Sequence, residues 1–311
     1  MVSDIVISVL LTAHNCEKFL SATLASLKDA CNGVQDSIEI ILINDASTDN
    51  TQKILHDFAA ICPHAKTFDV TFRNIGKVRN YGVSKCKGKY ITMLDGDDQL
   101  LKNSLSEVTH FLQKENPDLL VAPLNEVFPH QNRTKTWGGL NTQKLTQHQI
   151  IKKFLIHKDL QAHFIGQFIR ADLLKDKPFP EFTCYEDAYL FPSILKDSKN
   201  IFFANQSPYL YFKREKSLSN KLDEHKISLL IKATQRMDEV LGDKYRNLLT
   251  CHWINIAHKF NGLIHNEHDK HLVYSAILKA SLLSFTLDST VRTSFKKKFL
   301  KLKLKLKLKR W

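Results

Sequence analysis

The sequence lacks the marks of a metal-cluster, disulfide-stabilised or membrane-spanning protein. Its six cysteines, at positions 16, 31, 62, 86, 184 and 251, include no CxxC pair, so their spacing indicates neither a zinc site nor a disulfide framework. We expect reduced thiols that serve mostly as small core residues. No apolar run approaches the ~18 residues of a membrane span. The N-terminus lacks a basic region before its apolar run, so no signal peptide is expected.

Acidic residues are missing from positions 292–311, which hold ten of the 45 basic residues. The rest of the chain contains 35 basic and 32 acidic residues, so the net charge of +13 belongs mainly to this terminal segment. A nucleic-acid-binding fold usually spreads its cations over one face. We therefore expect no nucleic-acid partner.

Lysine and leucine alternate strictly from 301 to 308. This alternation would separate the two residue types on a strand and spread the leucines around a helix. Near anionic lipid each Lys or Arg contributes about 1 kcal/mol. We hypothesise that residues 296–310 dock an otherwise cytoplasmic protein on the anionic inner face of the cell membrane. The alternative is a disordered, solubilising tail.

Short apolar runs alternate with amphipathic segments over the first hundred residues. The runs at 5–11, 38–43, 67–72 and 90–94 predict strands that are apolar on both faces. This pattern predicts an α/β fold, a parallel sheet covered by helices. Polar clusters follow the first, second and fourth strands, at the edge where open α/β sheets bind ligands. A nucleotide-binding half is therefore expected there.

The later part of the chain predicts more helix. A helix, a strand at 118–127 and a polar loop or hairpin at 128–147 precede mixed structure to 212, and 222–285 are helical with few breakers. We expect a domain over 1–220 with halves 1–100 and 101–220, a helical extension over 221–290 and a basic Lys/Leu tail over 291–311.

The sharpest local signal is Asp95-Gly96-Asp97-Asp98 at the end of a strand. Carboxylates beside a nucleotide diphosphate would repel it unless a divalent cation lay between them. Mg²⁺ and Mn²⁺ take oxygen ligands from carboxylates and phosphates. The motif therefore predicts a metal and diphosphate site, with a solvated acidic turn or a helix cap as the alternative.

A second polar cluster spans Asn44 to Asp49 after another buried-type strand. Ser47 or Asp49 could cap the helix that begins near Asn50. Asp45 stands at the strand end and is harder to explain as a cap. Its carboxylate could accept the N–H of a base such as uracil.

Six stretches, in register over roughly residues 5–220, together resemble the family-2 glycosyltransferases with the GT-A fold. They are ISVLLTAHN (7–15), IEIILINDASTDNT (38–51), NIGKVRNYGVSKCKGKYITMLDGDD (74–98), IGQFIRADLL (165–174), CYEDAYL (184–190) and YLYFKREKSLSN (209–220). The resemblance implies a Rossmann-like, mostly parallel sheet flanked by helices, with a C-terminal helical extension. It also implies transfer of a sugar from a nucleotide-sugar donor, for which a UDP-sugar is our first expectation, with Mn²⁺ or Mg²⁺ as cofactor.

The resemblance also implies roles for individual residues. Asp187 matches the catalytic base, with its neighbour Glu186 as a second expected catalytic residue, and Asp95, Asp97 and Asp98 match the metal-binding acids. The implied donor contacts are Thr12, His14, Asn15, Asp45, Arg79, Asp95, Lys213 and Arg214. One position departs from the family, which usually has acids at both 44 and 45. Because Asn44 still donates and accepts hydrogen bonds, we expect a changed contact and retained activity.

A mechanism follows from the chemistry of glycosyl transfer. The acceptor hydroxyl must lose its proton to a carboxylate within hydrogen-bond reach, and the departing diphosphate needs charge stabilisation. Direct displacement with one base inverts the anomeric centre. We expect an inverting enzyme acting on a glycan or lipid-linked acceptor in bacterial capsule or lipopolysaccharide synthesis.

Alternative readings remain at this stage. The chain could be a nucleotide-sugar-binding or membrane-binding module that kept the fold and lost catalysis, although the complete set of acids argues against it. The pair Glu186-Asp187 taken alone could be a surface acidic pair or a helix start. The histidines at 252, 258, 265, 268 and 271 fit no metal motif, and we expect them on a solvated helical face.

Overall fold

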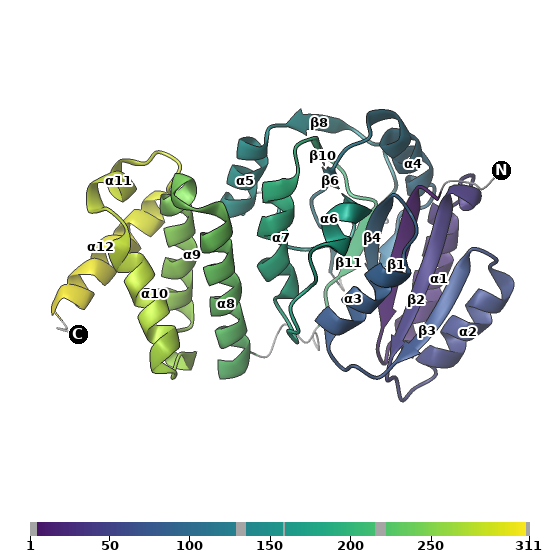
Figure 1. Cartoon of the computed structure of the whole chain (residues 1–311), viewed down its shortest axis with the longest axis horizontal. Coiled ribbons are helices and arrows are strands. Elements are labelled where there is room, and N and C mark those ends of the chain that lie inside the picture. Colours follow the sequence, from purple (N-terminus) through teal and green to yellow (C-terminus); the bar gives the residue numbers. More distant parts are fainter. Residues whose placement is uncertain (1–4, 129–134, 158, 215–221, 309–311) are drawn as a thin grey trace.

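The computed structural model describes residues 5–128, 135–157, 159–214 and 222–308. It shows an α/β domain built on a large sheet, with a group of C-terminal helices extending to one side (Figure 1). The predicted fold class is confirmed. The six cysteines are all free and buried or half-buried, as expected. No helix in the described ranges combines the length and apolar character needed to cross a membrane.

The large sheet has eight strands in the order β3-β2-β1-β4-β9-β6-β10-β8. The first four are mutually parallel, whereas β9 runs antiparallel to both of its neighbours and β8 runs antiparallel to β10. In sheet order the strands are β3 Ala65–Val70, β2 Ile38–Asp45, β1 Ile7–Ala13, β4 Tyr90–Asp95, β9 Phe168–Arg170, β6 Leu119–Val121, β10 Ile201–Ala204 and β8 Thr142–Leu145.

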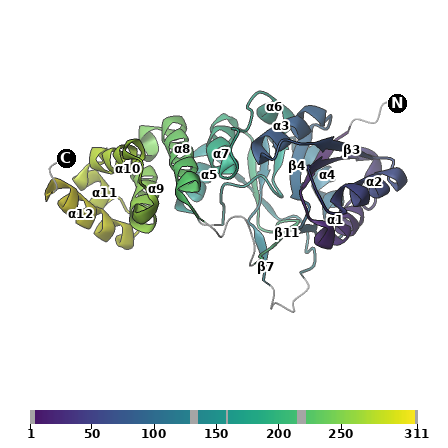
Figure 2. The same ribbon diagram turned by 90° about the horizontal axis from the view of Figure 1, so that it is seen from below.

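Helices cover both faces of this sheet, which explains why its central strands are apolar throughout. Every residue of β2 is buried. One face carries α1 Glu17–Ala30, α2 Thr51–Ile61 and α4 Ser104–Glu115, and the other carries α3 Ile75–Lys85, α6 Ala171–Lys175 and α7 Glu186–Asp197 (Figures 1 and 2).

The strand order reverses at β1. The chain leaves β1 for β2 and β3 on one side, and α3 then carries it back to β4 on the other side. Thr12 near the end of β1 pairs in register with Asp95 at the end of β4. Open α/β sheets bind ligands at such a switch point, outside the carboxyl ends of the strands.

The prediction of one continuous strand over 118–127 was wrong. The segment divides into β6 in the large sheet and β7 Asn125–Val127, which joins a second sheet ordered β5-β11-β7. The other members of that sheet are β5 Gln99–Leu100 and β11 Tyr209–Phe212. The predicted loop or hairpin at 128–147 contains β8, which pairs with the distant β10. Residues 129–134 lie outside the described ranges. Apolar runs do not reveal where a chain changes sheets.

The C-terminal helices form a second hydrophobic core. Their first member, α8, lies against α7 of the α/β domain (Figure 1). They are α8 Glu224–Leu241, α9 Arg246–Lys259, α10 Glu267–Lys279, α11 Leu282–Leu287 and α12 Thr293–Leu308.

The Lys/Leu segment is helical as far as Leu308 and is anchored on the other helices. Phe299 is fully buried, with its ring 4.2 Å from that of Phe285 in α11. The Lys303 ammonium donates to the carbonyls of Leu278 and Ala280 at 3.0 and 2.6 Å. Of the two conformations considered from the sequence, the helix is therefore observed. Residues 309 and 310 lie outside the described ranges.

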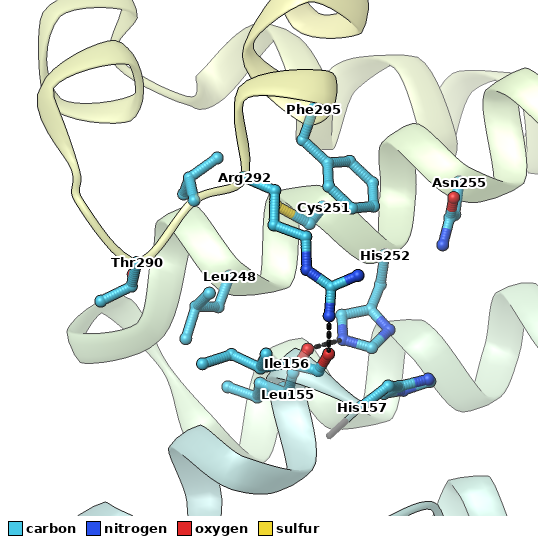
Figure 3. Close-up of a pocket in the computed structure, with 11 residues that line it drawn as sticks. Leu155, Ile156, His157, Leu248, Cys251, His252, Asn255, Thr290, Arg292 and Phe295 are labelled. Carbon is cyan, nitrogen blue, oxygen red and sulfur yellow. Dashed lines mark hydrogen bonds between the residues drawn. The ribbon is translucent and has the colours of Figure 1, made fainter. Parts of the chain in front are cut away.

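Figure 3 shows the joint between the two parts, at the C-terminal end of α5 Gln147–Ile156. The last carbonyls of a helix lack intrahelical partners, and cations near them are favourable. Arg292 Nη2 donates to the Ile156 carbonyl at 3.2 Å, and His252 Nε2 donates to the Leu155 carbonyl at 3.1 Å (Figure 3). The two bonds satisfy carbonyls that the helix leaves open.

The expectation of a solvated histidine face was wrong for His252. Burial lowers its pKa to about 3, and its ring centroid lies 4.8 Å from that of His157. The other members of the set, His258, His265, His268 and His271, are exposed as expected.

Candidate active site

A buried arginine joins three carboxylates from distant parts of the chain. Arg79, on α3, is 5% exposed, and its Nη1 donates to Glu186 Oε1 at 2.6 Å and also to Asp187 Oδ1. Its Nη2 lies 3.9 Å from Asp95 Oδ1 at the end of β4. We call these four residues the Arg79 cluster. The predicted base Asp187 and the predicted metal ligand Asp95 thus meet at one guanidinium.

The electrostatics of the Arg79 cluster reflect its burial. Burial raises the pKa of Asp95 to about 6, against the opposing effect of Arg79. Burial likewise raises the pKa of Asp187 above its usual range, with Arg79 again opposing. Burial alone would lower the pKa of Arg79, but Asp187, Glu186 and Asp95 raise it above its ordinary value. A permanent cation therefore stands beside Asp95 and Asp187, two carboxyls whose pKa values burial raises.

Helix α3 also holds the loop that leads into α7. The Asn80 amide bonds the Phe179 backbone in both directions, donating to its carbonyl at 2.9 Å and accepting from its N–H at 2.7 Å. Lys77 pairs with Glu181 at 2.9 Å. A β-carbon added at Gly76 would lie 1.9 Å from the Pro180 carbonyl oxygen, so only glycine permits this approach. The helix that carries Arg79 thus also positions Glu186 and Asp187.

The three acids of the Asp95–Asp98 motif differ in their surroundings. The side chains of Asp95 and Asp97 are 33% and 40% exposed, whereas that of Asp98 is 1% exposed. Asp98 accepts hydrogen bonds from the Tyr209 hydroxyl at 2.6 Å and from the Phe212 N–H at 2.8 Å. Burial raises the pKa of Asp98 to about 7. Asp98 therefore ties the motif to β11, and Asp95 and Asp97 remain open to a ligand.

The two predicted cations of the 209–220 stretch have different partners. The Arg214 guanidinium bonds Asp97 Oδ2 at 2.7 Å and stacks 4.1 Å over the Phe19 ring. Lys213 instead pairs with Glu126 of β7 at 2.9 Å. The structure thus brings Arg214, and not Lys213, to the acidic motif. Residues 215–220 of this stretch lie outside the described ranges.

The nucleoside side of the predicted site forms at the ends of β1 and β2. The His14 ring bonds the Asp45 carbonyl at 2.6 Å, and Asn15 Oδ1 accepts from the Thr48 N–H at 2.7 Å. The Asp45 carboxylate accepts from the Arg73 N–H at 2.9 Å. A side-chain hydrogen bond from Thr12 to Asp95, which partly opposes the rise in pKa that burial gives Asp95, links this group to the acidic motif. Thr12, His14, Asn15 and Asp45 lie together at this edge, and their contact with the donor remains a prediction.

The caps of the helices after β1 and β2 are shared. Asp49, one of the two predicted caps of α2, accepts from the Thr51 N–H at 3.0 Å and from the Glu17 N–H at 3.1 Å. The Glu17 carboxylate accepts from the Asn50 N–H at 2.9 Å in return. Ser47 instead accepts from the Asn15 N–H at 3.1 Å. These bonds hold the two loops in one arrangement.

The departure at Asn44 has a structural partner. Asn44 pairs in register with Asp69 of β3, and its amide donates to the Asp69 carboxylate at 2.8 Å. Asp69 also bonds His56 at 2.8 Å. A second acid at position 44 would face a carboxylate, whereas asparagine supplies a donor. The changed contact expected from the sequence is therefore a bond to the neighbouring strand.

Sequence reasoning missed two contributors to the site, Tyr209 and Phe19, and the partners of a third, Arg79. Arg79 was expected near the donor, but nothing in its neighbourhood indicated a buried partner for Asp187. Tyr209 and Phe19 look like ordinary core residues in the sequence, yet they contact Asp98 and Arg214. A tyrosine within an apolar strand carries a hydroxyl that needs a partner when buried, and that was the available signal.

The carboxylates fit a divalent cation only if a ligand supplies further oxygens. In the described ranges no group of three or more His, Cys, Asp or Glu side chains converges on one point as a metal site. Mg²⁺ and Mn²⁺ commonly take one or two carboxylates and complete their shell with substrate phosphates and water. Asp95 and Asp97 provide that hard-oxygen donor set.

Gly76→Ala should destabilise the protein by about 1–3 kcal/mol, because the added methyl group overpacks against the Pro180 carbonyl. Alanine would otherwise favour the helix. Gly262→Ala is the control, since a β-carbon there meets nothing within 4 Å. Urea denaturation measures both variants, and equal free energies of unfolding would contradict the close approach.

Asn44→Asp should lower the free energy of unfolding by about 1–2 kcal/mol at pH 8, since it replaces a donor with a charge facing Asp69. The double variant Asn44→Asp/Asp69→Asn restores an amide–carboxylate pair and should recover most of the loss. Denaturant titrations of the two single variants and the double variant give the coupling energy. A double variant no more stable than Asn44→Asp would show that the two side chains do not interact.

Comparison with known proteins agrees with this geometry. The family model described as glycosyl transferase family 2 matches residues 8–175. An uncharacterized glycosyltransferase of Mycoplasma pneumoniae is 30% identical over 220 residues, which cover 67% of this chain and 69% of that protein. The minor teichoic acid biosynthesis protein GgaB of Bacillus subtilis is 28% identical over 213 residues. The match covers 67% of this chain and only 23% of that longer protein.

Among solved structures, the crystal structure of S. aureus TarS 1-349 in complex with UDP-GlcNAc superposes with a TM-score of 0.71. It covers 96% of this chain and 88% of that chain, at 19% sequence identity. The likeness extends beyond the family match into the C-terminal helices and concerns the fold. Together with the family match over 8–175, it leads to one conclusion: this chain belongs to glycosyl transferase family 2 and is a glycosyltransferase with the GT-A fold.

Proposed function

We propose that the protein is an inverting, divalent-metal-dependent glycosyltransferase that moves a sugar from a UDP-sugar to a glycan or lipid-linked acceptor. The observation that carries the proposal is the Arg79 cluster. It sets the carboxylate of Asp187, from α7, beside that of Asp95, from the sheet edge. Base and donor-binding acid thereby share one site, as single displacement requires.

Asp187 acts as the base in this proposal. Its side chain is 17% exposed, so one edge remains accessible to an acceptor hydroxyl. The raised pKa that burial gives its carboxyl favours proton uptake during transfer. Glu186, 8% exposed and bonded to Arg79, fixes the guanidinium that orients Asp187. A single base on one face of the sugar corresponds to inversion.

The donor would lie over the sheet edge at the switch point. Asp95 and Asp97 would hold Mn²⁺ or Mg²⁺ together with the diphosphate, and the cation would stabilise the charge of the leaving group. Arg214, next to Asp97, would contact the same diphosphate. Asp98 would position β11, while Asp45, His14 and Asn15 would surround the base. The UDP-GlcNAc held by the S. aureus structural neighbour supports a UDP-sugar.

The biological setting we favour is the synthesis of a bacterial surface polymer. The name of the B. subtilis relative supports a teichoic-acid type of polymer, and this is now preferred to capsule or lipopolysaccharide. The enzyme would work in the cytoplasm at the inner face of the membrane, to which the cations of 296–310 would attract it. In α12 the side chains of Lys297, Lys301 and Lys305 are exposed.

A binding module without catalysis is the second candidate. It would need no accessible base, whereas Asp187 is both accessible and held by a buried ion pair. Burying such charges is costly unless they are paired, and a module that only binds the donor has no use for that cost.

Asp187→Asn should lower the rate of sugar transfer by about 10³-fold or more, because the acceptor hydroxyl loses its base. The dissociation constant for the UDP-sugar in the presence of Mn²⁺ should stay within about threefold of the parental value. Asp197→Asn, the same change at the other end of α7, where the side chain pairs with Lys177, is the matched control. Calorimetry and a coupled UDP-release assay, each with and without EDTA, measure binding, transfer and the need for metal. Transfer at the parental rate by Asp187→Asn would exclude it as the base.

Replacing Lys297, Lys301 and Lys305 by glutamine should weaken binding to phosphatidylglycerol vesicles about tenfold or more, since each lysine contributes about 1 kcal/mol near anionic lipid. Lys18, Lys28 and Lys102, exposed lysines of the α/β domain, serve as a charge-matched control set. Vesicle co-sedimentation at fixed ionic strength compares the two triple variants. Equal losses would mean that net charge, and not the helix, drives association.

A further inference from the structure

The short helix α11 exposes an unusual amount of apolar surface. Leu282, Leu283 and Leu287 are 49%, 69% and 72% exposed, while Phe285 points inward and is fully buried. Leu278, at the end of α10, is a further 39% exposed. Exposed apolar clusters on soluble proteins commonly mark contact surfaces. Three large leucines on six residues form a compact apolar projection, which we call the α11 wedge: Leu282, Leu283 and Leu287.

A cationic cavity of about 520 Å³ opens against α11, the helix that carries the α11 wedge. Ser281 and Ser284 of the α11 segment line it directly. Its basic side chains come from α5, the short turn before α9, α9 itself and α10, and they are Lys152, Lys244, Arg246 and Lys279. The volume is within the ~300–1,000 Å³ of ordinary small-molecule sites.

Of the two acidic side chains of the cavity, Asp243 is paired with a cation and Asp288 is bonded to neutral groups. Asp243 bonds Arg246, and Asp288 accepts from Asn247 at 2.9 Å and from Thr290. Within the described ranges Lys152, Lys244 and Lys279 form no ion pair with protein carboxylates. The four basic side chains of the cavity outnumber its two carboxylates, Asp243 and Asp288, although Lys152 interacts electrostatically with Asp288.

An adjoining cavity of about 110 Å³, drawn in Figure 3, shares Leu248 and Thr290 with it. Arg292 lines this smaller cavity and adds a further cation. Ammonium and guanidinium groups with serine hydroxyls suit a phosphate anion. The combined lining thus favours a phosphate-bearing ligand.

The cavity lies away from the catalytic carboxylates. Its residues His148 and Lys152 are on α5, whose Gln147 side chain donates to the carbonyls of Lys196 and Ser198 at the C-terminal end of α7. Asp187 stands at the opposite, N-terminal end of α7. A ligand in this cavity would therefore leave the donor and the base unobstructed.

We propose that this surface binds an anionic phospholipid, with the headgroup phosphate in the cationic cavity and the α11 wedge inserted among the acyl chains. Charge complementarity and the adjacent apolar projection select a lipid over a soluble anion, since a soluble anion would need no exposed leucines beside it. The proposal extends the membrane association proposed above to a second contact. It rests on that association and not on the reaction catalysed.

The test uses the full chain with an unaltered C-terminal segment. Two variants each remove one half of the surface: Leu283→Asp/Leu287→Asp, and Lys152→Gln/Lys244→Gln/Lys279→Gln. Each should bind phosphatidylglycerol–phosphatidylcholine vesicles about tenfold or more weakly than the parent. The Lys18→Gln/Lys28→Gln/Lys102→Gln variant should retain parental affinity, and pure phosphatidylcholine should bind the parent weakly.

Parental vesicle affinity in both variants would overturn the proposal, as it would place the whole contact in residues 296–310. A second result would also overturn the proposal. Inorganic phosphate at low millimolar concentration would raise the melting temperature of the parent but not of the lysine variant, and the two proteins would bind vesicles equally. The ligand of the cavity would then be a soluble phosphate. UDP-sugar hydrolysis without vesicles is measured on every preparation. A variant that hydrolyses the UDP-sugar at the parental rate is correctly folded. If the parent itself shows no hydrolysis, the proposed function is contradicted and the lipid-binding proposal is not.

Discussion

One buried guanidinium organises the functional half of this molecule. Arg79 is 5% exposed and contacts Glu186 and Asp187 from α7 and approaches Asp95 from β4. Carboxylates that converge in a buried place repel one another and lose solvation, so each would tend to bind a proton. A permanent cation among them lets acids from sequence positions about a hundred apart occupy one site. Removing one partner of a buried ion pair destabilises the fold strongly, because the other charge is left buried and unpaired.

The topology supplies the rest of the arrangement. The reversal at β1 places Thr12 and Asp95 side by side at the carboxyl edge. Helix α3, which returns the chain across that edge, carries both Arg79 and the contacts of Gly76, Lys77 and Asn80 that hold the loop before α7. The proposed base, the acidic motif and the proposed nucleoside loops are therefore positioned by the same helix and the same sheet edge. The proposed transfer chemistry depends on that common support.

Much of this could be predicted from the sequence, for identifiable reasons. The runs that became β1, β2 and β4 are apolar because both of their faces are covered, whereas the edge strand β3 is partly exposed, and polar residues at strand ends marked the edge that carries the proposed site. Periodicity could not locate the break between β6 and β7, where the chain changes sheets. It also could not show that Asp98 bonds Tyr209 or that Lys213 pairs with Glu126. Those partners come from other strands and leave no local pattern.

The pH dependence of the stability of Arg79→Met tests the central claim most directly. Without the cation, burial would keep the pKa values of Asp95 and Asp187 above their unfolded values. Stability would then be retained at low pH and lost as pH rises through the raised pKa, by about 1.4 kcal/mol per group for each unit of difference. We predict that the free energy of unfolding of Arg79→Met is only slightly below that of the parent near pH 5. This difference should grow by several kcal/mol towards pH 8. Arg236→Met, at an exposed pair with Glu239, should show no such trend. A deficit of Arg79→Met that is constant across this range would indicate lost packing alone and would contradict the account.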